Sequence, residues 1–242
     1  SVDVTFLRKA AARGYCTIRS GVAVTRIEAG ADERVTGVHL VNGAGVDEYI
    51  TMPKLIVAYG AVETPRLLLA SANQYAPNGL ANESGQVGRN FMETLAWSSS
   101  ALHLEKLGSF RGLPADSISW DFNAPDAIEG VVGGCRFSTG TAEAGLNGPM
   151  AYARRIVGGW GRAHRAAMRE GFGRIMTVGS IGESLPNAET YIDLDPSQVD
   201  SNGVALAKIH SQLEPMDLKR LTFMRKTARA ILEASGAKQI VE

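Results

Sequence analysis

Cysteine is scarce in this sequence, and neither sign of charge is in excess. Its 242 residues include two cysteines, Cys16 and Cys135, far apart and outside any CxxC or Cys/His cluster. This count argues against a zinc site and excludes a disulfide framework. We expect both thiols to be buried in a reducing, cytoplasmic compartment. Basic and acidic residues number 25 each, so the zero formal net charge gives no indication of a nucleic acid or an anionic membrane as a partner.

Long apolar runs and metal-binding motifs are missing as well. No run of about 18 apolar residues occurs, so no membrane span is predicted. Asp193–Gly203 superficially resembles a calcium loop but lacks the glycine at the sixth position and the closing glutamate. We therefore predict a hairpin turn there and no metal site. With 45% apolar and 21% charged residues, the chain has the composition and length of one large globular domain or two modest ones.

Residues 54–71 organise the first part of the chain. Residues 54–58 are mainly apolar and predict a strand buried on both faces. Gly60 permits a tight turn that a Cβ would crowd, and Thr64 with Pro65 predicts the N-cap and first residue of a helix. This geometry directs free backbone N–H groups and the positive end of the helix dipole at one point, where an anion such as a cofactor phosphate fits. Many α/β folds contain such a turn, so the spacing alone leaves a purely structural turn open.

The segments before residue 95 alternate as amphipathic strands do, after an N-terminal helix. We predict a helix over residues 4–12, a short strand over 15–19, and three further strands that form a meander over 22–28, 35–41 and 46–51. Residues 72–89 are rich in Asn, Gly, Pro and Ser and predict a loop.

After residue 95 the pattern predicts an antiparallel sheet followed by a long helix. Alternating runs occur at residues 97–104, 117–122, 174–181, 190–194 and 204–213, and residues 162–172 predict an intervening helix. The last helix is predicted from Pro215 to Gly236. Its apolar face would consist of Leu218, Leu221, Ala228, Ile231 and Leu232, with Lys219, Arg220, Arg225 and Lys226 opposite.

Two motifs point to a known family. Residues 58–68 read AYGAVETPRLL, and residues 79–93 combine GLAN with GQVGRNFME. Both resemble the glucose–methanol–choline (GMC) family of flavoprotein oxidoreductases, in the same order and at about the same separation. The resemblance implies an α/β fold (α+β overall). Part of a Rossmann-like FAD-binding domain with a β-meander would occupy residues 1–95, with the final helix, 215–242, packing back on it, and an antiparallel-sheet substrate domain would occupy residues 96–214.

The resemblance also implies roles for individual residues. It places Val24 at the adenine contact of FAD and makes Ala58, Gly60 and Thr64 cofactor-binding residues. The walls of the substrate channel would include Asn90 and Phe91. We assign no catalytic residue, since Thr94 stands where many relatives have a histidine.

Two parts of the family's machinery have no counterpart in this sequence. The G-x-G-x-x-G turn that holds the pyrophosphate is missing, as is the C-terminal histidine that takes the hydroxyl proton. We therefore expect the chain to be the central fragment of a larger enzyme, inactive when isolated and binding FAD weakly or not at all. The parent enzyme would oxidise CH–OH groups of small-molecule alcohols, sugars or polyols by hydride transfer to flavin, with an undetermined electron acceptor. The alternative is a non-catalytic GMC-like domain that binds a partner protein.

The histidines and the basic stretch around His164 have simpler interpretations. His39, His103 and His210 have no carboxylate or second histidine at ligand spacing along the sequence, so we interpret them as structural or surface residues. Arg162 and Arg165 flank His164 on the predicted helix. This stretch is either a solvated helix face or a docking surface for an acidic substrate or an electron-accepting partner.

Overall fold

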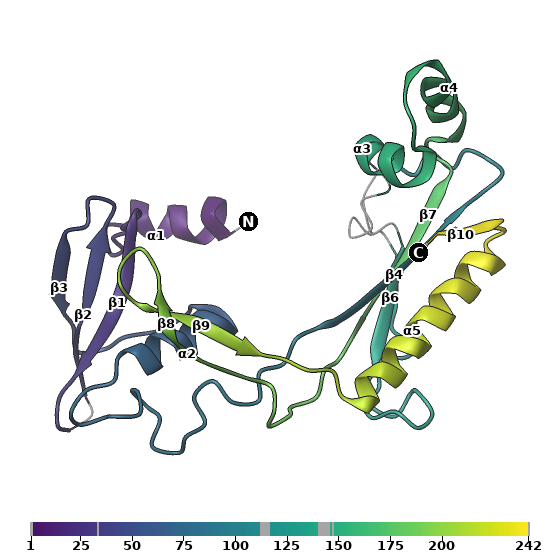
Figure 1. The fold of residues 1–242 in the computed structure, drawn as a ribbon. Helices are drawn as coiled ribbons and strands as arrows, with labels where there is room; N and C mark the ends of the chain where they lie inside the picture. The colour runs from purple at the N-terminus through teal and green to yellow at the C-terminus, as the bar shows by residue number, and fades with distance from the viewer. Residues whose placement is uncertain (1, 33, 112–116, 140–145, 147, 242) are drawn as a thin grey trace. The chain divides into compact units, whose positions relative to one another are not determined.

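The computed structural model describes residues 2–32, 34–111, 117–139, 146 and 148–241 (Figure 1). The chain divides into two compact units. The first contains Ser1–Phe91 and Ala188–Ser211, and the second contains Met92–Asn187 and Gln212–Glu242. All strand pairings between the described residues are antiparallel, so the fold is α+β with antiparallel sheets.

The first unit begins with a helical segment and a three-stranded meander. The π-helical turn η1 (Asp3–Leu7) continues into α1 (Arg8–Ala12), which confirms the predicted helix. The strands β1 (Val22–Ala29), β2 (Val35–Asn42) and β3 (Asp47–Thr51) pair in sequence order, as predicted. The turn between β2 and β3 forms because the Asn42 side-chain oxygen accepts bonds from the N–H groups of Ala44 and Val46, at 2.9 and 3.1 Å. Alternation places one face of the meander on an apolar core of Ile27, Val38, Leu40, Leu67 and Leu80.

Two predicted strands of the first unit do not form. Residues 15–19 and 54–58 belong to no sheet, and Ile56 is 91% exposed. A strand exists only where its backbone N–H and C=O groups pair with a neighbour, and in the described part of the chain no strand pairs with either segment. An apolar run therefore predicts β-propensity but does not supply the partner strand.

The helix after this segment, α2 (Gly60–Ala70), begins a full turn earlier than predicted. Gly60 has φ +77° and turns the chain into the helix, whereas Thr64 and the buried Pro65 lie within it. Pro65 removes a single intrahelical bond near the helix start, so α2 accommodates it. The N-cap prediction for Thr64 was wrong because the glycine turn already begins the helix. The loop predicted after α2, residues 72–89, is confirmed.

The second unit is built on a five-stranded antiparallel sheet, as the alternating runs predicted. Its order is β10 (Gln239–Val241), β4 (Leu95–Leu102), β7 (Ile175–Gly182), β6 (Cys135–Thr139) and β5 (Ile118–Ser119). The sequence analysis missed β6 and β10, which are short. The last two predicted runs form β8 (Tyr191–Val199) and β9 (Ala205–His210), a separate hairpin that belongs to the first unit.

Helices complete the second unit. A helical pair contains α3 (Pro149–Tyr152), which continues into the π-helical turn η3 (Ala153–Val157), and α4 (Gly161–Gly171), close to the predicted helix. Figure 1 shows the long helix α5 (Pro215–Ala234) alongside the sheet, where it contacts β4, β7 and β6. The sequence analysis expected it on the first unit instead. No helix in the described part of the chain is long and apolar enough to cross a membrane.

The buried face of α5 differs from the predicted one. Met224, Ala228 and Leu232 are fully buried, but Leu218 is 52% exposed and Arg220, predicted to be solvated, is 0% exposed. The Arg220 guanidinium is buried because it donates to the backbone carbonyls of residues 132, 133 and 183 and pairs with Asp217 at 3.1 Å. Sequence periodicity could not reveal these acceptors, since they come from loops far away in the chain.

Candidate functional site

The backbone N–H groups at the start of α2 are exposed hydrogen-bond donors. Tyr59 precedes the helix with φ −88° and ψ 4°, and no side chain caps the first N–H groups. A Cβ built on Gly60 would meet nothing within 4 Å. The requirement for glycine therefore comes from its positive φ, and the predicted crowding of a Cβ was wrong. Ala58, Tyr59 and Gly60 are all exposed, so the positive end of the helix dipole faces solvent.

A small cavity joins the start of α2 to the first strand of the meander. Its volume is about 120 Å³, and its walls come from β1, the first turns of α2 and the β8–β9 turn. Val24 and Tyr59 both line it. The structure thus brings together Val24 and the start of α2, which the sequence analysis had assigned to one cofactor from segments far apart in the chain. Thr64 lies beyond them, half-buried in the second turn of the helix.

Arg66 closes this cavity and attaches the β8–β9 hairpin to α2. Its guanidinium lies 2.9 Å from the Glu63 carboxylate and 2.7 Å from the Asp200 carboxylate, and its Nε donates to the Ala205 carbonyl at 2.7 Å. Burial acts to raise the pKa of Asp200. The bond from Arg66 and the backbone N–H groups of Val204 and Asn202 outweigh it, so the pKa lies below its ordinary value. The pairing also occupies Glu63, the acidic residue in the first turn of α2.

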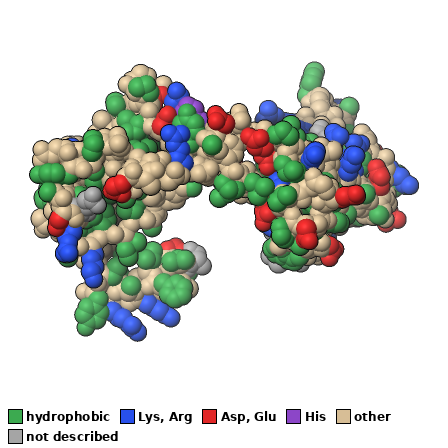
Figure 2. Space-filling view, turned by 90° about the horizontal axis from the view of Figure 1, so that it is seen from below, with side chains coloured by type: hydrophobic (Ala, Val, Ile, Leu, Met, Phe, Trp, Pro, Cys, Tyr) green, Lys and Arg blue, Asp and Glu red, His purple; other side chains and the backbone are tan. Residues whose placement is uncertain are grey.

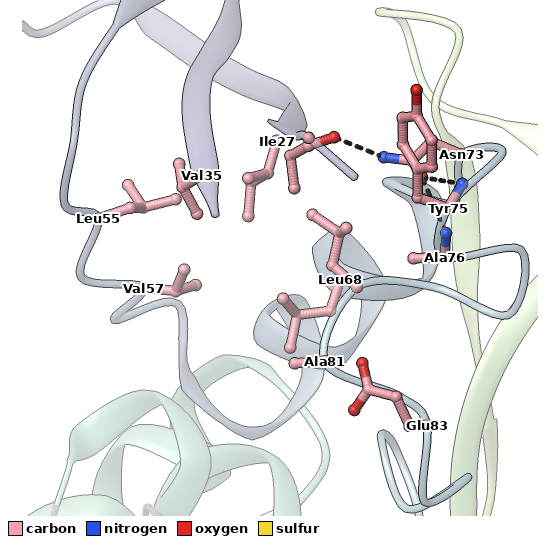
Figure 3. Close-up of a pocket in the computed structure, with 13 residues that line it drawn as sticks. Ile27, Val35, Leu55, Val57, Leu68, Asn73, Tyr75, Ala76, Ala81 and Glu83 are labelled. Carbon is pink, nitrogen blue, oxygen red and sulfur yellow. Dashed lines mark hydrogen bonds between the residues drawn. The ribbon is translucent and has the colours of Figure 1, made fainter. Parts of the chain in front are cut away.

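A second cavity, of about 280 Å³, lies on the apolar side of the meander (Figure 3). Its labelled lining residues are mainly aliphatic, among them Ile27, Leu55 and Leu68. The polar group of Asn73 is already used, since it donates to the Ala29 carbonyl at 3.2 Å and accepts from the Tyr75 N–H at 2.8 Å. The cavity therefore offers mainly apolar contact, with the Glu83 carboxylate as a further polar group in its lining.

The second sequence motif runs beside the hairpin strand β8. The N–H of Phe91 donates to the Thr190 carbonyl at 2.9 Å, and the N–H of Ile192 donates to the Gly88 carbonyl at 2.8 Å. A Cβ on Gly88 would overlap the Ile192 carbonyl oxygen, so this close approach requires glycine. Asn90 is exposed with φ +53°, and Phe91 is half-buried. Their backbone is therefore well held, while the Asn90 side chain is open to solvent.

Two aromatic and charged clusters escaped the sequence analysis. The Arg89 guanidinium lies 4.5 Å from the centre of the Tyr191 ring, which stacks on His210 at 4.1 Å. His210 also lies 3.2 Å from the Asp193 carboxylate across the hairpin.

The other cluster is in the meander, where His39 lies 3.4 Å from both Glu28 and Asp47. Strand pairing creates these contacts, so spacing along the sequence could not predict them. Within the described ranges, no group of three or more His, Cys, Asp or Glu residues could hold a metal ion.

Comparison with known proteins places this geometry in context. Residues 1–96 match a family model described as GMC oxidoreductase. The 2-methyl-1,2-propanediol dehydrogenase of Mycolicibacterium austroafricanum is 29% identical over 80% of this chain and 38% of its own length. The gluconate 2-dehydrogenase flavoprotein of Pantoea cypripedii is 26% identical over 93% of this chain and 37% of its own. The chain thus spans less than two fifths of either relative.

Solved structures show the same fold. A crystal structure of formate oxidase superimposes with a TM-score of 0.55 at 14% identity, over 89% of this chain and 43% of that chain. A second formate oxidase structure, from Aspergillus oryzae and solved in a study of FAD modification, gives the same values. At this identity the likeness concerns the fold alone.

Proposed function

Because the chain belongs to the GMC oxidoreductase family, we propose that it is part of an FAD-dependent enzyme that oxidises CH–OH groups of alcohols, sugars or polyols. The first unit would contribute part of a Rossmann-like FAD-binding domain, and the second unit would contribute substrate-domain structure. Two relatives favour this substrate class, since their names specify a diol and gluconate. A formate oxidase with a similar fold has been studied for modification of its FAD.

The observation that carries the proposal is the shared cavity at the start of α2. Val24 of β1 and Tyr59 beside Gly60 line it together. The adjacent N–H groups of α2 have no side-chain cap, and the acidic group in its first turn is ion-paired with Arg66, which Asp200 shares. These features fit the adenosine and phosphate part of a dinucleotide, because exposed N–H groups at a helix start favour an anion.

The chain's own residues would bind and orient the cofactor. Backbone groups of Val24 and Ala58 would contact it, and Gly60 would allow the chain to turn beneath it. Thr64 would support this turn from within α2. Asn90 and Phe91 would form part of the substrate channel, with their backbone held by the contact to β8. When bound, the flavin supplies the hydride acceptor. We assign no residue of this chain to the proton transfer.

The test is a visible absorption spectrum of the protein purified from its source, combined with its intact mass. We expect flavin bands that bleach without oxygen when a simple diol, a sugar or gluconate is added. A matched carboxylate without a hydroxyl group, such as acetate, should leave the bands unchanged. A colourless protein would contradict the proposal and favour the non-catalytic GMC-like domain that binds a partner protein.

The FAD content of a Gly60 variant tests whether the start of α2 contacts the cofactor. Gly60→Ala should lower the amount of FAD that copurifies, because an alanine at φ +77° forces the start of α2 to shift. Gly43→Ala is the matched control, since Gly43 is exposed in the same unit, its φ is not positive and a Cβ there meets nothing within 4 Å. Equal FAD content in the two variants would remove Gly60 from the site.

A further inference from the structure

The connection between η3 and α4 presents an exposed indole. Trp160 is 90% exposed, although tryptophan is usually well buried in folded proteins. It is flanked by Gly158, Gly159 and Gly161, whose φ values are +63°, +68° and +78°. A Cβ added at any of these glycines would meet nothing within 4 Å. The loop therefore stands clear of the described residues around it, with its largest side chain in solvent.

Positive charge surrounds this indole. Residues 149–171 contain five arginines, at positions 154, 155, 162, 165 and 169, against one acidic residue, Glu170 at the end of α4. Three of them, Arg162, Arg165 and Arg169, recur on one face of α4, and all three are exposed. Elsewhere the charges are mixed, and Figure 2 shows acidic and basic side chains interspersed over the face it displays. The zero net charge of the whole chain conceals this local excess.

Hydrogen bonds and an apolar cluster attach the elements on both sides of this loop to the second unit. The His164 Nδ1 atom lies 2.7 Å from the Gly158 carbonyl, and the Tyr152 hydroxyl donates to the Gly171 carbonyl at 2.7 Å. Beneath both helices lies an apolar cluster centred on Leu146, Tyr152 and Ile175. The helices on both sides of the loop are thus attached to this cluster, while Trp160 itself extends into solvent.

A cleft at the other end of α4 also combines cationic and apolar side chains. It has a volume of about 740 Å³, and its lining includes Lys106, Arg111 and Arg169, with no acidic residue among the described ones. One wall is aromatic, because the rings of Phe110 and Phe172 stack with their centres 5.0 Å apart. Cations beside apolar surface suit a ligand with an anionic head and an apolar body.

We propose that this end of the second unit, defined by Trp160 and the arginines of η3 and α4, binds an anionic phospholipid surface. An indole inserts at the boundary between head groups and acyl chains, and arginine pairs with lipid phosphates in two-point contacts. The indole stands on a protruding loop rather than in a hollow, so it can enter a deformable surface without a preformed partner pocket. The arrangement combines an apolar anchor with a basic face, the two features that direct proteins to lie on a membrane without spanning it.

The test is sedimentation of the full chain with vesicles of phosphatidylcholine containing phosphatidylglycerol, compared with vesicles of phosphatidylcholine alone. We expect binding to the anionic vesicles, weakened by salt because the attraction between surface charges is screened. Trp160→Ser should reduce the partition coefficient about ten-fold through the loss of buried apolar area. Replacing Arg162 and Arg165 by glutamine should reduce it about five-fold per charge.

A matched control removes the same charge elsewhere. Lys219→Gln combined with Arg225→Gln changes two exposed cations on α5 and should leave vesicle binding unchanged. Equal losses in this control and in the α4 variant would overturn the proposal, because the attraction would then be unspecific. Failure to bind anionic vesicles would also overturn the proposal. An acidic protein surface would then be the favoured partner of Trp160 and these arginines.

Discussion

The two units of this chain are stabilised by different means. In the second, the main buried core has nine residues, and α5 contributes three of them, Met224, Ala228 and Leu232. In the first, five residues form the buried core, and a polar clamp at Arg66 attaches the hairpin. Both units leave large apolar side chains exposed, including Tyr15 at 96% and Ile56 at 91% in the first and Trp160 at 90% in the second. The family motifs thus lie where internal packing is thinner, so exposed backbone is available for a ligand.

The reaction of Cys135 with a thiol reagent can report the stability of the second unit, and Cys16 in the first unit provides a reference. Cys135 is buried in β6, and burial raises the pKa of its thiol to about 11. The thiolate is the reactive form, so this thiol should react with a thiol reagent only after the second unit opens. Cys16, in the first unit, is half-buried rather than buried as expected. It should react earlier and serves as an internal reference.

The largest expected effect comes from removing the buried cation of α5. Arg220→Ala should destabilise the second unit by about 3–5 kcal/mol, because Asp217 and three carbonyls lose their partner in a buried site. The labelling rate of Cys135 in increasing urea measures this loss. Arg225→Ala, exposed on the same helix, is the control and should change little. If Cys135 of the Arg220→Ala protein were labelled at the same urea concentration as in the control, the buried network would not be stabilising.

A smaller effect is expected at the clamp of the first unit. Asp200→Asn keeps an oxygen for the hairpin N–H groups but loses the charge paired with Arg66, and should cost about 1–2 kcal/mol at neutral pH. Urea unfolding followed by far-ultraviolet circular dichroism, with Cys135 labelling run in parallel to report the second unit, measures this cost.

The same residue makes the clamp sensitive to pH. The folded-state pKa of Asp200 is lowered, so the stability that its charge contributes is present above the unfolded-state value, about 4, and is lost as the pH falls through the folded-state pKa. The difference between the two proteins should therefore shrink in acid. A difference that stays constant with pH would assign the effect to packing instead of charge.

The smallest effect is expected at the start of α2. Gly60→Ala should destabilise the first unit by about 1 kcal/mol, because an L-residue at φ +77° is strained even where space is available. Gly43→Ala should be neutral or slightly stabilising, since it only reduces the freedom of the unfolded chain. Urea unfolding of both variants, followed by far-ultraviolet circular dichroism, measures the difference. Destabilisation of both by the same amount would show that the effect does not depend on the positive φ of Gly60.

Much of the local structure was predictable from the sequence because its causes are local. The meander follows from alternating side chains and from a turn that Asn42 closes with its own side chain. The long helix follows from its periodicity and from Pro215 at its start. The elements that failed were those whose formation requires a distant partner. Residues 54–58 have the composition of a buried strand, yet no described strand pairs with them.

The site was predictable only in part. Gly60 and Val24 were identified from motifs, and the structure brings Val24 and the start of α2 to one cavity. Arg66 was present in the same motif, but its role could not be inferred because its partner Asp200 is 134 residues away. The contact between His210 and Asp193 likewise could not be inferred from their positions in the sequence. Side chains that meet across strands or between elements leave no spacing signal in the chain.

The sequence by itself determined the family, the helix and strand types of most segments, and the need for glycine at the α2 turn. These depend on side-chain alternation, backbone conformation and short motifs, all set within a few residues. Tertiary structure alone decided that α5 packs on the second sheet, that Arg220 is buried, and that β8–β9 joins the first unit. Each of these is a contact between segments far apart in the chain or a difference in burial, and the free energy of such contacts depends on what else is close in space.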